Sequence, residues 1–173
     1  REDNNRAMTQ LSVVEPYVSQ IDIPAEPPRI SPGTGESVTI SVSAIGSRTD
    51  SWTLTWNTDS LPEDWTFELM NNQNINPTLI PNTPVDIDFA VTIPSDALGD
   101  ENSFVDLLLT LDSDQNISST VRLPIEVLRT RGFSVVGPDG LGVSEGIGKP
   151  GSTATAWMMV ENLGNAYEST TSI

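Results

Sequence analysis

The sequence predicts an all-β protein, a sandwich of about seven antiparallel strands. Three observations support this prediction. Apolar and polar residues alternate in several short segments, no segment places apolar residues at helical spacing, and turn-forming residues separate the alternating segments. Because such a strand has only one apolar face, each sheet needs a second sheet packed against it.

The alternation is clearest at 38–44, where Val38, Ile40 and Val42 lie on one face and Thr39 and Ser41 on the other. This segment is therefore expected to be a half-buried strand. The same period predicts five further strands, at 52–56, 65–69, 85–93, 105–111 and 121–127.

A seventh strand is expected at 17–23, ahead of the others. It is followed by Pro24, Pro27 and Pro28. Because proline has no N–H for a ladder hydrogen bond, these residues cannot extend a central strand. We therefore expect an edge strand that breaks or switches from one sheet to the other.

Composition excludes several classes of function. The chain has 173 residues, with 24 acidic and 8 basic side chains, a net charge of −16, and neither cysteine nor histidine. It therefore lacks disulfides, thiolate nucleophiles, histidine ligands and the Ser-His-Asp triad. A pI near 4.1 argues against nucleic acid as a partner, because phosphate binding depends on lysine and arginine. No segment is apolar over the roughly 20 residues of a membrane span, so no membrane insertion is expected.

The chain also contains an internal similarity. An offset of 118 residues aligns Pro32-Gly33 with Pro150-Gly151 and Gly46 with Gly164, and the segment LSVV at 11–14 is similar to IEVL at 125–128 at a slightly different offset. This predicts the tail of a preceding repeat or a disordered leader at 1–14, a complete repeat at 15–130, and a partial second repeat at 131–173.

Three segments carry a family resemblance: PGTGESVTISVSAIG from Pro32, LPEDW at 61–65 and LIPNTPVDIDFAVTIPSDALGD at 79–100. Together they resemble the NPCBM-associated immunoglobulin-like repeats and the related CARDB (cell-adhesion-related) domains. Where these families often have an Asn-x-Gly turn, this sequence has Ala44-Ile45-Gly46, and the second copy restores the turn as Asn162-Leu163-Gly164. Asp64 stands where glycine is common before the tryptophan.

This resemblance implies an immunoglobulin-like β-sandwich followed by the start of a second copy. It also implies a non-enzymatic spacer, assembly or adhesion module, located outside the cell or on the cell surface. The alternative is a module that binds carbohydrate or protein, with calcium as a candidate ion. Expected partners are neighbouring repeats, other copies of the chain, or a protein or glycan ligand. The partial repeat is expected to dock on the full one or pair with another copy, to which residues 8–14 could supply a strand.

The candidate calcium ligands are Asp112, Asp114 and Asn116, because alternate oxygen-bearing residues in a turn can converge on a hard cation. The segment is not an EF-hand, since Ile117 occupies the glycine position and Leu123 the position of the bidentate glutamate. A solvated hairpin turn explains the same residues without calcium. A second acidic loop, with Asp96, Asp100 and Glu101, leaves the same two interpretations open.

The tryptophans suggest sugar stacking at first sight, but Trp52, Trp56 and Trp65 are in phase with the apolar faces of their strands. We therefore expect them in the core. Trp157 differs, because Ala154, Ala156, Met158 and Val160 alternate with it and are expected to face the core of the second copy. Trp157 and Met159 are expected to point away from that core.

Overall fold

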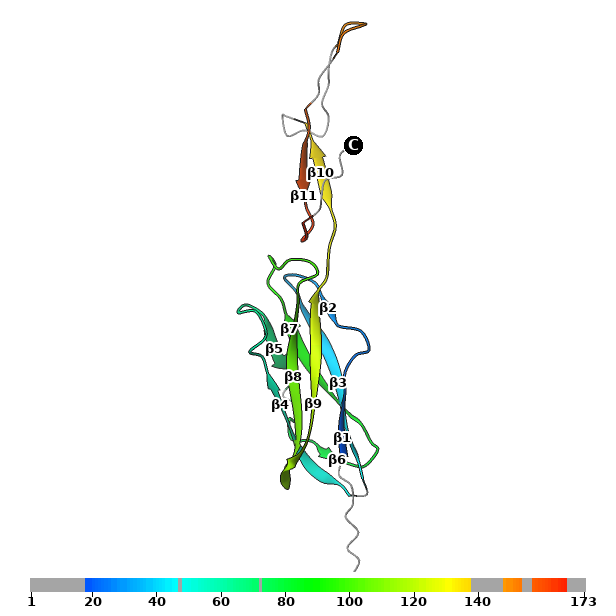
Figure 1. Cartoon of the computed structure of the whole chain (residues 1–173), viewed down its shortest axis with the longest axis vertical. Coiled ribbons are helices and arrows are strands. Elements are labelled where there is room, and N and C mark those ends of the chain that lie inside the picture. Colours follow the sequence, from blue (N-terminus) through cyan, green and yellow to red (C-terminus); the bar gives the residue numbers. More distant parts are fainter. Residues whose placement is uncertain (1–17, 47, 72, 138–147, 154–156, 168–173) are drawn as a thin grey trace, which may run out of the picture.

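The computed structural model of the chain describes residues 18–46, 48–71, 73–137, 148–153 and 157–167, and every regular element within them is a β-strand (Figure 1). One sheet has the order β1 (Val18–Asp22), β3 (Gly35–Ile45), β7 (Val85–Thr92), β5 (Thr66–Leu69). The facing sheet has the order β2 (Arg29–Ile30), β9 (Asp114–Val127), β8 (Asn102–Leu111), β4 (Asp50–Asn57), β6 (Thr78–Leu79). A separate two-stranded sheet contains β10 (Phe133–Val136) and β11 (Met159–Asn162).

The two larger sheets form an immunoglobulin-like sandwich, which confirms the predicted fold class. With β1, β3, β4, β5, β7, β8 and β9 taken as strands A to G, the first sheet has the order A-B-E-D and the second contains G-F-C. Neighbours among these seven strands pair antiparallel. No helix in the described part of the chain has the length and hydrophobicity to cross a bilayer.

The first strand does break and switch sheets, as its prolines predicted. β1 pairs with β3 in one sheet, whereas β2 pairs in parallel with the end of β9 in the other. Between them, Pro24, Pro27 and Pro28 carry the chain across the edge of the sandwich. The switch buries Ile30 almost completely, so this two-residue strand closes the core at one edge.

The core lies between the two sheets and contains the apolar side of each alternating strand. At its centre, Phe89 stacks on Phe67 with ring centroids 4.4 Å apart and meets Trp56 edge-on at 5.1 Å. Trp52 and Trp65 are buried, and Trp56 is half-buried against the same cluster. The expectation that these three tryptophans serve the core is confirmed.

The hairpin between β8 and β9 is tighter than the sequence indicated. The expected loop at 112–116 is reduced to Asp112 and Ser113, because Leu111 already pairs with Asp114 across a register irregularity. β9 thus begins at Asp114, well before the expected start at 121. In its first half Ile117 is the single apolar residue, so the period-two signal was too weak to detect there although the backbone pairs with β8.

The two-stranded sheet of β10 and β11 repeats the pairing of β1 with β3 in the sandwich. Ile21 on β1 lies opposite Val42 on β3, and Val135 on β10 lies opposite Val160 on β11. The offset between the β3 and β11 residues is 118, which is the offset found in the sequence, and between the β1 and β10 residues it is 114. The offset of 114 residues also aligns 11–14 with 125–128 in the sequence. Residues 1–17 lie outside the described part of the chain, so the structure does not test that alignment.

The turns before β3 and β11 also share their geometry. Gly33 and Gly151 both have positive φ, 73° and 84°, as the third residue of a Pro-Gly turn requires. In the first turn the main-chain N–H and the hydroxyl of Thr34 both donate to the carbonyl of Ser31, at 3.2 and 2.7 Å. In the second turn Ser152 donates in the same way to Lys149, at 3.0 and 2.7 Å.

One expectation about the predicted partial repeat at 131–173 is wrong. Met158 and Val160 were expected in a core, yet they are 63% and 57% exposed, because no described strand packs over the two-stranded sheet. Trp157 is exposed as expected, and so is Met159. Ala154 and Ala156 lie outside the described residues.

Candidate functional site

The candidate site is the junction between the sandwich and the β10–β11 hairpin. β9 leads through residues 128–132 directly into β10, so the two bodies follow each other along one axis (Figure 1). The turn after β11, at 162–167, returns to this linker and contacts it. The junction is therefore built from two segments that lie more than thirty residues apart in the sequence.

Asn165 provides most of the polar contacts of the junction. Its side-chain Nδ2 donates to the carbonyl of Leu128 at 2.9 Å. Its Oδ1 accepts from the main-chain N–H of Thr130 at 2.7 Å and from the hydroxyl of Thr130 at 3.1 Å. One amide side chain thus satisfies both a donor and an acceptor of the linker backbone, which fixes the linker conformation.

The main chain of Asn165 extends the contact to the sandwich itself. The N–H of Gly99, in the loop between β7 and β8, donates to the carbonyl of Asn165 at 2.6 Å. The N–H of Asn165 donates to the carbonyl of Thr130 at 3.3 Å. The hairpin is therefore hydrogen-bonded both to the linker and to a loop of the preceding sandwich.

Two glycines at the junction have no room for a side chain. A Cβ on Gly164 would lie 2.5 Å from the carbonyl oxygen of Thr130, and a Cβ on Gly99 would lie 2.7 Å from Oδ1 of Asn165. Neither residue has a positive φ, so these glycines are required by close packing and not by backbone conformation. The two bodies approach each other as closely as their backbones permit.

The Asn-x-Gly motif at 162–164 shapes the turn that carries Asn165. Asn162 accepts from the N–H of Gly164 at 2.9 Å and donates to the carbonyl of Ala166 at 2.7 Å. Sequence reasoning identified this motif as a turn but missed its role in holding the junction, and it missed Asn165 altogether. The available signal was a second asparagine directly after the glycine.

A charged pair lies beside these hydrogen bonds. Nη1 of Arg129 donates to Oδ2 of Asp100 at 2.7 Å. Asp100, expected in the acidic loop with Asp96 and Glu101, therefore binds an arginine. Among the described residues, no group of three or more carboxylate, imidazole or thiol side chains is placed to hold a metal ion.

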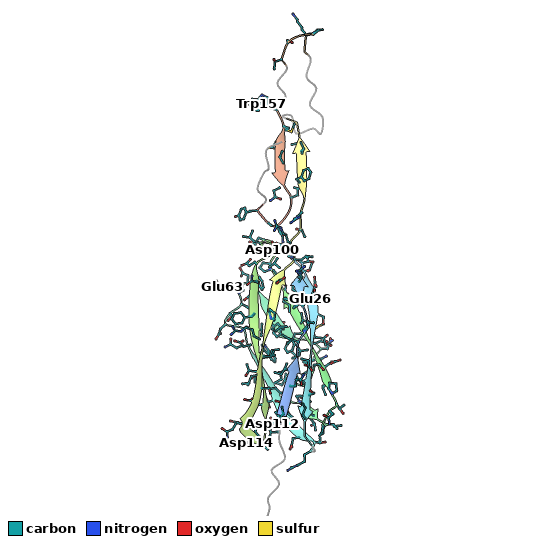
Figure 2. All side chains as sticks on the ribbon, turned by 45° about the vertical axis from the view of Figure 1, so that its right-hand side comes forward. Glu26, Glu63, Asp100, Asp112, Asp114 and Trp157 are labelled. Carbon is teal, nitrogen blue, oxygen red and sulfur yellow. The ribbon has the colours of Figure 1, made fainter. Side chains whose placement is uncertain are left out.

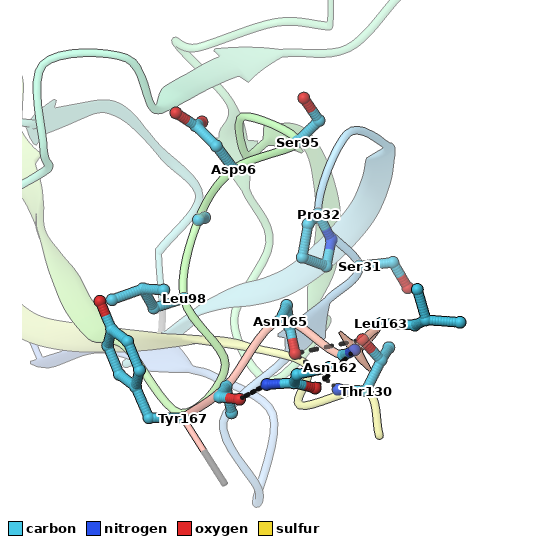
Figure 3. A pocket seen from close by; sticks show the side chains of 13 residues that line it. Ser31, Pro32, Ser95, Asp96, Leu98, Thr130, Asn162, Leu163, Asn165 and Tyr167 are labelled. Carbon is cyan, nitrogen blue, oxygen red and sulfur yellow. Dashed lines mark hydrogen bonds between the residues drawn. The ribbon is translucent and has the colours of Figure 1, made fainter. Parts of the chain in front are cut away.

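A groove of about 510 Å³ opens at the junction. The sandwich contributes Ser31, Ser95, Asp96 and Leu98, and the turn after β11 contributes Tyr167. Figure 3 shows Tyr167 with Leu98 toward one end of the groove and Asp96 with Ser95 toward the other. Tyr167 is 87% exposed, so its ring is free to contact a ligand.

The predicted calcium ligands lie at the other end of the sandwich. Figure 2 shows Asp112 and Asp114 far from Asp100 and the junction. Oδ1 of Asp114 accepts from both the N–H and the side-chain amide of Asn116 at 3.0 Å, whereas Oδ1 of Asp112 accepts from Thr53 at 2.7 Å. Asp114 and Asn116 thus form a local turn, and calcium binding there remains a prediction.

The surface of the sandwich carries one bidentate ion pair with a clear electrostatic effect. Nε and Nη2 of Arg122 donate to the two carboxylate oxygens of Asp106 at 2.8 and 3.1 Å. These hydrogen bonds hold the pKa of Asp106 below its usual value and raise the pKa of Arg122. The guanidinium also lies 3.7 Å from the centroid of the Phe104 ring.

Comparison with known proteins gives neighbours in structure only. No protein-family model matches the chain, and no curated protein matches its sequence. The secreted serine protease VesC from Vibrio cholerae superposes with a TM-score of 0.46 and 12% identity, over 64% of this chain and 23% of VesC. The PapD-like domain 7 of human CEP192 gives a TM-score of 0.44 and 13% identity, over 74% of this chain and 96% of that domain. A conjugative transposon lipoprotein from Bacteroides eggerthii superposes with a TM-score of 0.37 and 12% identity, over 64% of this chain and 96% of the lipoprotein.

Proposed function

We propose that this chain is a non-enzymatic, immunoglobulin-like repeat of an extracellular or cell-surface protein, and that it serves as a spacer or assembly module. The observation that carries the proposal is the junction, where Asn165 hydrogen-bonds the end of the β10–β11 hairpin to the linker and to a loop of the sandwich. We interpret this hairpin as the beginning of a second copy. Fastened copies in series form an extended rod, in which each domain contacts mainly its neighbours.

Two features support the interpretation of the hairpin as a second copy. The pairing of β10 with β11 has the same register as that of β1 with β3. The Pro-Gly turns before β3 and β11 share their positive φ and both of their hydrogen bonds. If the two segments were similar only because both are β-strands, we would not expect them to share both the strand register and the geometry of the preceding Pro-Gly turn.

The composition also suits this role. The absence of cysteine and histidine removes the most common nucleophiles and general bases. A net charge of −16 favours solubility and opposes non-specific association, and salt in an extracellular fluid screens the self-repulsion.

The experiment measures whether the joint is fixed. The chain has no cysteine, so Glu63→Cys and Glu161→Cys place one spin label on the sandwich and one on β11. The labelled chain is diluted with unlabelled chain. Double electron–electron resonance then measures the distance between the two labels of one molecule, without a contribution from labels on neighbouring molecules. We expect a narrow distance distribution, which Asn165→Ala broadens. Asn74→Ala, whose side-chain hydrogen bonds stay within the turn at 74–76, is the matched control and should leave the distribution narrow.

A broad distribution in the parent chain would refute the fixed joint and the proposed spacer function with it. The same result for Asn165→Ala and Asn74→Ala would show that the hydrogen bonds of Asn165 do not hold the joint.

The groove at the junction favours a second candidate, a module that binds carbohydrate or protein. The groove has an exposed tyrosine at one end, which can stack on a sugar ring, and a carboxylate at the other, which can accept from sugar hydroxyls. The candidate calcium ligands Asp112, Asp114 and Asn116 lie at the other end of the sandwich, so calcium there would support a separate contact and not the groove. Glycan-array binding in calcium and in chelator tests it, and Tyr167→Ala should abolish any signal that arises from the groove.

A further inference from the structure

One asparagine of the chain has the sequence context of a sugar acceptor. Asn116-Ile117-Ser118 is the single Asn-x-Ser/Thr sequence without proline at its middle position. Asn76-Pro77-Thr78 has the same outline, but its proline excludes the transfer of a sugar to Asn76. Because a match of three residues often arises by chance, the structural setting of Asn116 decides whether it can carry a sugar.

The motif begins where β9 is not paired with its neighbour. Thr110 lies opposite Ser118 and Leu111 lies opposite Asp114, so residues 115–117 have no paired residue among those described on β8. They form a local irregularity directly after the β8–β9 turn. The backbone at Asn116 can therefore adjust to an enzyme without breaking ladder hydrogen bonds of the sandwich.

The side chains of the motif alternate between core and solvent. Ile117 packs against the core, whereas Asn116 and Ser118 are exposed on the opposite face of the strand. The acceptor amide and the hydroxyl two residues later are thus presented together to solvent. Because Ile117 anchors the segment, the folded protein keeps both groups accessible.

A hydrogen bond orients the acceptor amide and leaves part of it free. Nδ2 of Asn116 donates one of its two hydrogens to Oδ1 of Asp114 at 3.0 Å. Among the described residues, its other hydrogen has no acceptor. Attachment of a sugar replaces one amide hydrogen, so the modified side chain can keep its hydrogen bond to Asp114.

The surface beside the motif has room for a saccharide. A groove of about 400 Å³ reaches Gln115, the residue before Asn116. Its lining includes the hydroxyl-bearing residues Thr55 and Thr110, together with Leu108. Hydroxyl groups can exchange hydrogen bonds with those of a sugar, and the exposed leucine offers an apolar patch to the C–H face of a sugar ring.

We propose that Asn116 carries an N-linked saccharide. The sugar comes from a donor in which a lipid phosphate or diphosphate is bonded to its anomeric carbon. That carbon–oxygen bond breaks, Nδ2 of Asn116 bonds to the anomeric carbon and gives up one proton, and the lipid phosphate leaves. The inference rests on the proposed extracellular or cell-surface location. Asp112 and Asp114 mark this end of the sandwich in Figure 2, far from the junction, so the sugar does not obstruct the contacts of Asn165.

The first test uses the protein from the cells that produce it. Trypsin and the protease Asp-N release residues 114–122, in which Asn116 is the single asparagine. We expect the mass of this peptide to be raised by whole sugar residues, and electron-transfer fragmentation to place the added mass on Asn116. An unmodified peptide, or a sugar on one of its hydroxyl side chains instead, would overturn the proposal.

The second test separates the motif from the fold. The chain is directed through the secretory pathway of a host that attaches N-linked sugars. We expect the parent and Ser118→Thr chains to gain one glycan, and the Asn116→Gln and Ser118→Ala chains to lack it. Ser118→Thr keeps the required hydroxyl and is the matched control for Ser118→Ala. Far-UV circular dichroism should be the same for all four chains, and equal glycan content in all four would overturn the proposal.

The sugar and the proposed function can be tested apart. Unmodified Asn116 in a chain recovered from the cell surface would refute the sugar and keep the proposed location. A chain recovered only from the cytoplasm would refute the location, and the sugar with it. The distance distribution between the labels at 63 and 161 tests the joint independently of both results.

Discussion

Ser119 on β9 donates its hydroxyl proton to the main-chain carbonyl of Ser19 on β1 at 2.6 Å, and the two hydroxyl oxygens lie 2.7 Å apart. The two residues belong to opposite sheets. Ser19 is buried and provides a second contact through its own hydroxyl. This pair joins the sheets by hydrogen bonds at an edge that otherwise depends on apolar packing.

Ser119→Ala should destabilise the sandwich by about 1–2 kcal/mol, because it leaves the buried hydroxyl and carbonyl of Ser19 without their partner. Ser118→Ala is the matched control, since its side chain is exposed on the same strand, and it should change stability by less than about 0.5 kcal/mol. Urea denaturation followed by tryptophan fluorescence measures both values. Equal effects would mean that the hydroxyl pair does not stabilise the fold.

Phe89→Ala should cost about 3–5 kcal/mol in free energy of unfolding, because it opens a cavity and removes two ring contacts. Phe89 is completely buried between Phe67 and Trp56. Leu108→Ala, on the exposed side of β8, serves as the control and should cost less than about 1 kcal/mol. A loss near zero for Phe89→Ala would contradict the register of β7.

Gly164→Ala should loosen the joint without unfolding the sandwich. The added methyl group would lie 2.5 Å from the carbonyl of Thr130, so the turn after β11 must move away from the linker. Gly132→Ala is a close control, because its Cβ would meet the Cβ of Leu163 at an ordinary 3.4 Å. Limited proteolysis between residues 128 and 132 should be faster in Gly164→Ala and unchanged in Gly132→Ala.

The Asp106–Arg122 pair predicts a pH dependence of stability. Because folding lowers the pKa of Asp106 from its ordinary 3.8, the ionised pair stabilises the fold above that value. The contribution is lost as the pH falls below 3.8 through the lower pKa of the folded state. Thermal melts of the parent and Asp106→Asn should therefore differ at pH 7 and converge as the pH falls below 3.8. A difference that does not shrink below that pH would exclude ionisation of Asp106 as its source.

The alternating pattern was sufficient to predict the strands that form the centre of each sheet. It also assigned Trp52 and Trp65 to the core, because each lies on the same face of its strand as apolar neighbours while the other face is exposed to solvent. The pattern failed at β2 and β6, where strands of two residues bury Ile30 and Leu79 but offer no period to detect. It failed also at the start of β9, where Ile117 alone is apolar and one residue shows no period.

The candidate site was harder to predict than the fold. The sequence indicated two clusters of acidic residues as candidate calcium sites. In the structure Asp100 forms an ion pair with Arg129, and the carboxylate of Asp114 accepts hydrogen bonds from Asn116. The junction instead depends on the hydrogen bonds of Asn165 and on Gly99 and Gly164, where neighbouring atoms leave no room for a side chain. Close approach between segments far apart in the sequence has no local signature, so only three-dimensional contacts could reveal it.

The path of the chain through the sandwich also has a mechanical consequence. β1 begins near one end of the sandwich, and β9 leaves at the other toward β10 (Figure 1). Tension along this axis would load the parallel β2–β9 contact, including the ion pair between Arg29 and Glu126, in shear, so its bonds must fail together and not one after another. A string of such domains would transmit a pulling force from one end to the other with its sandwiches intact.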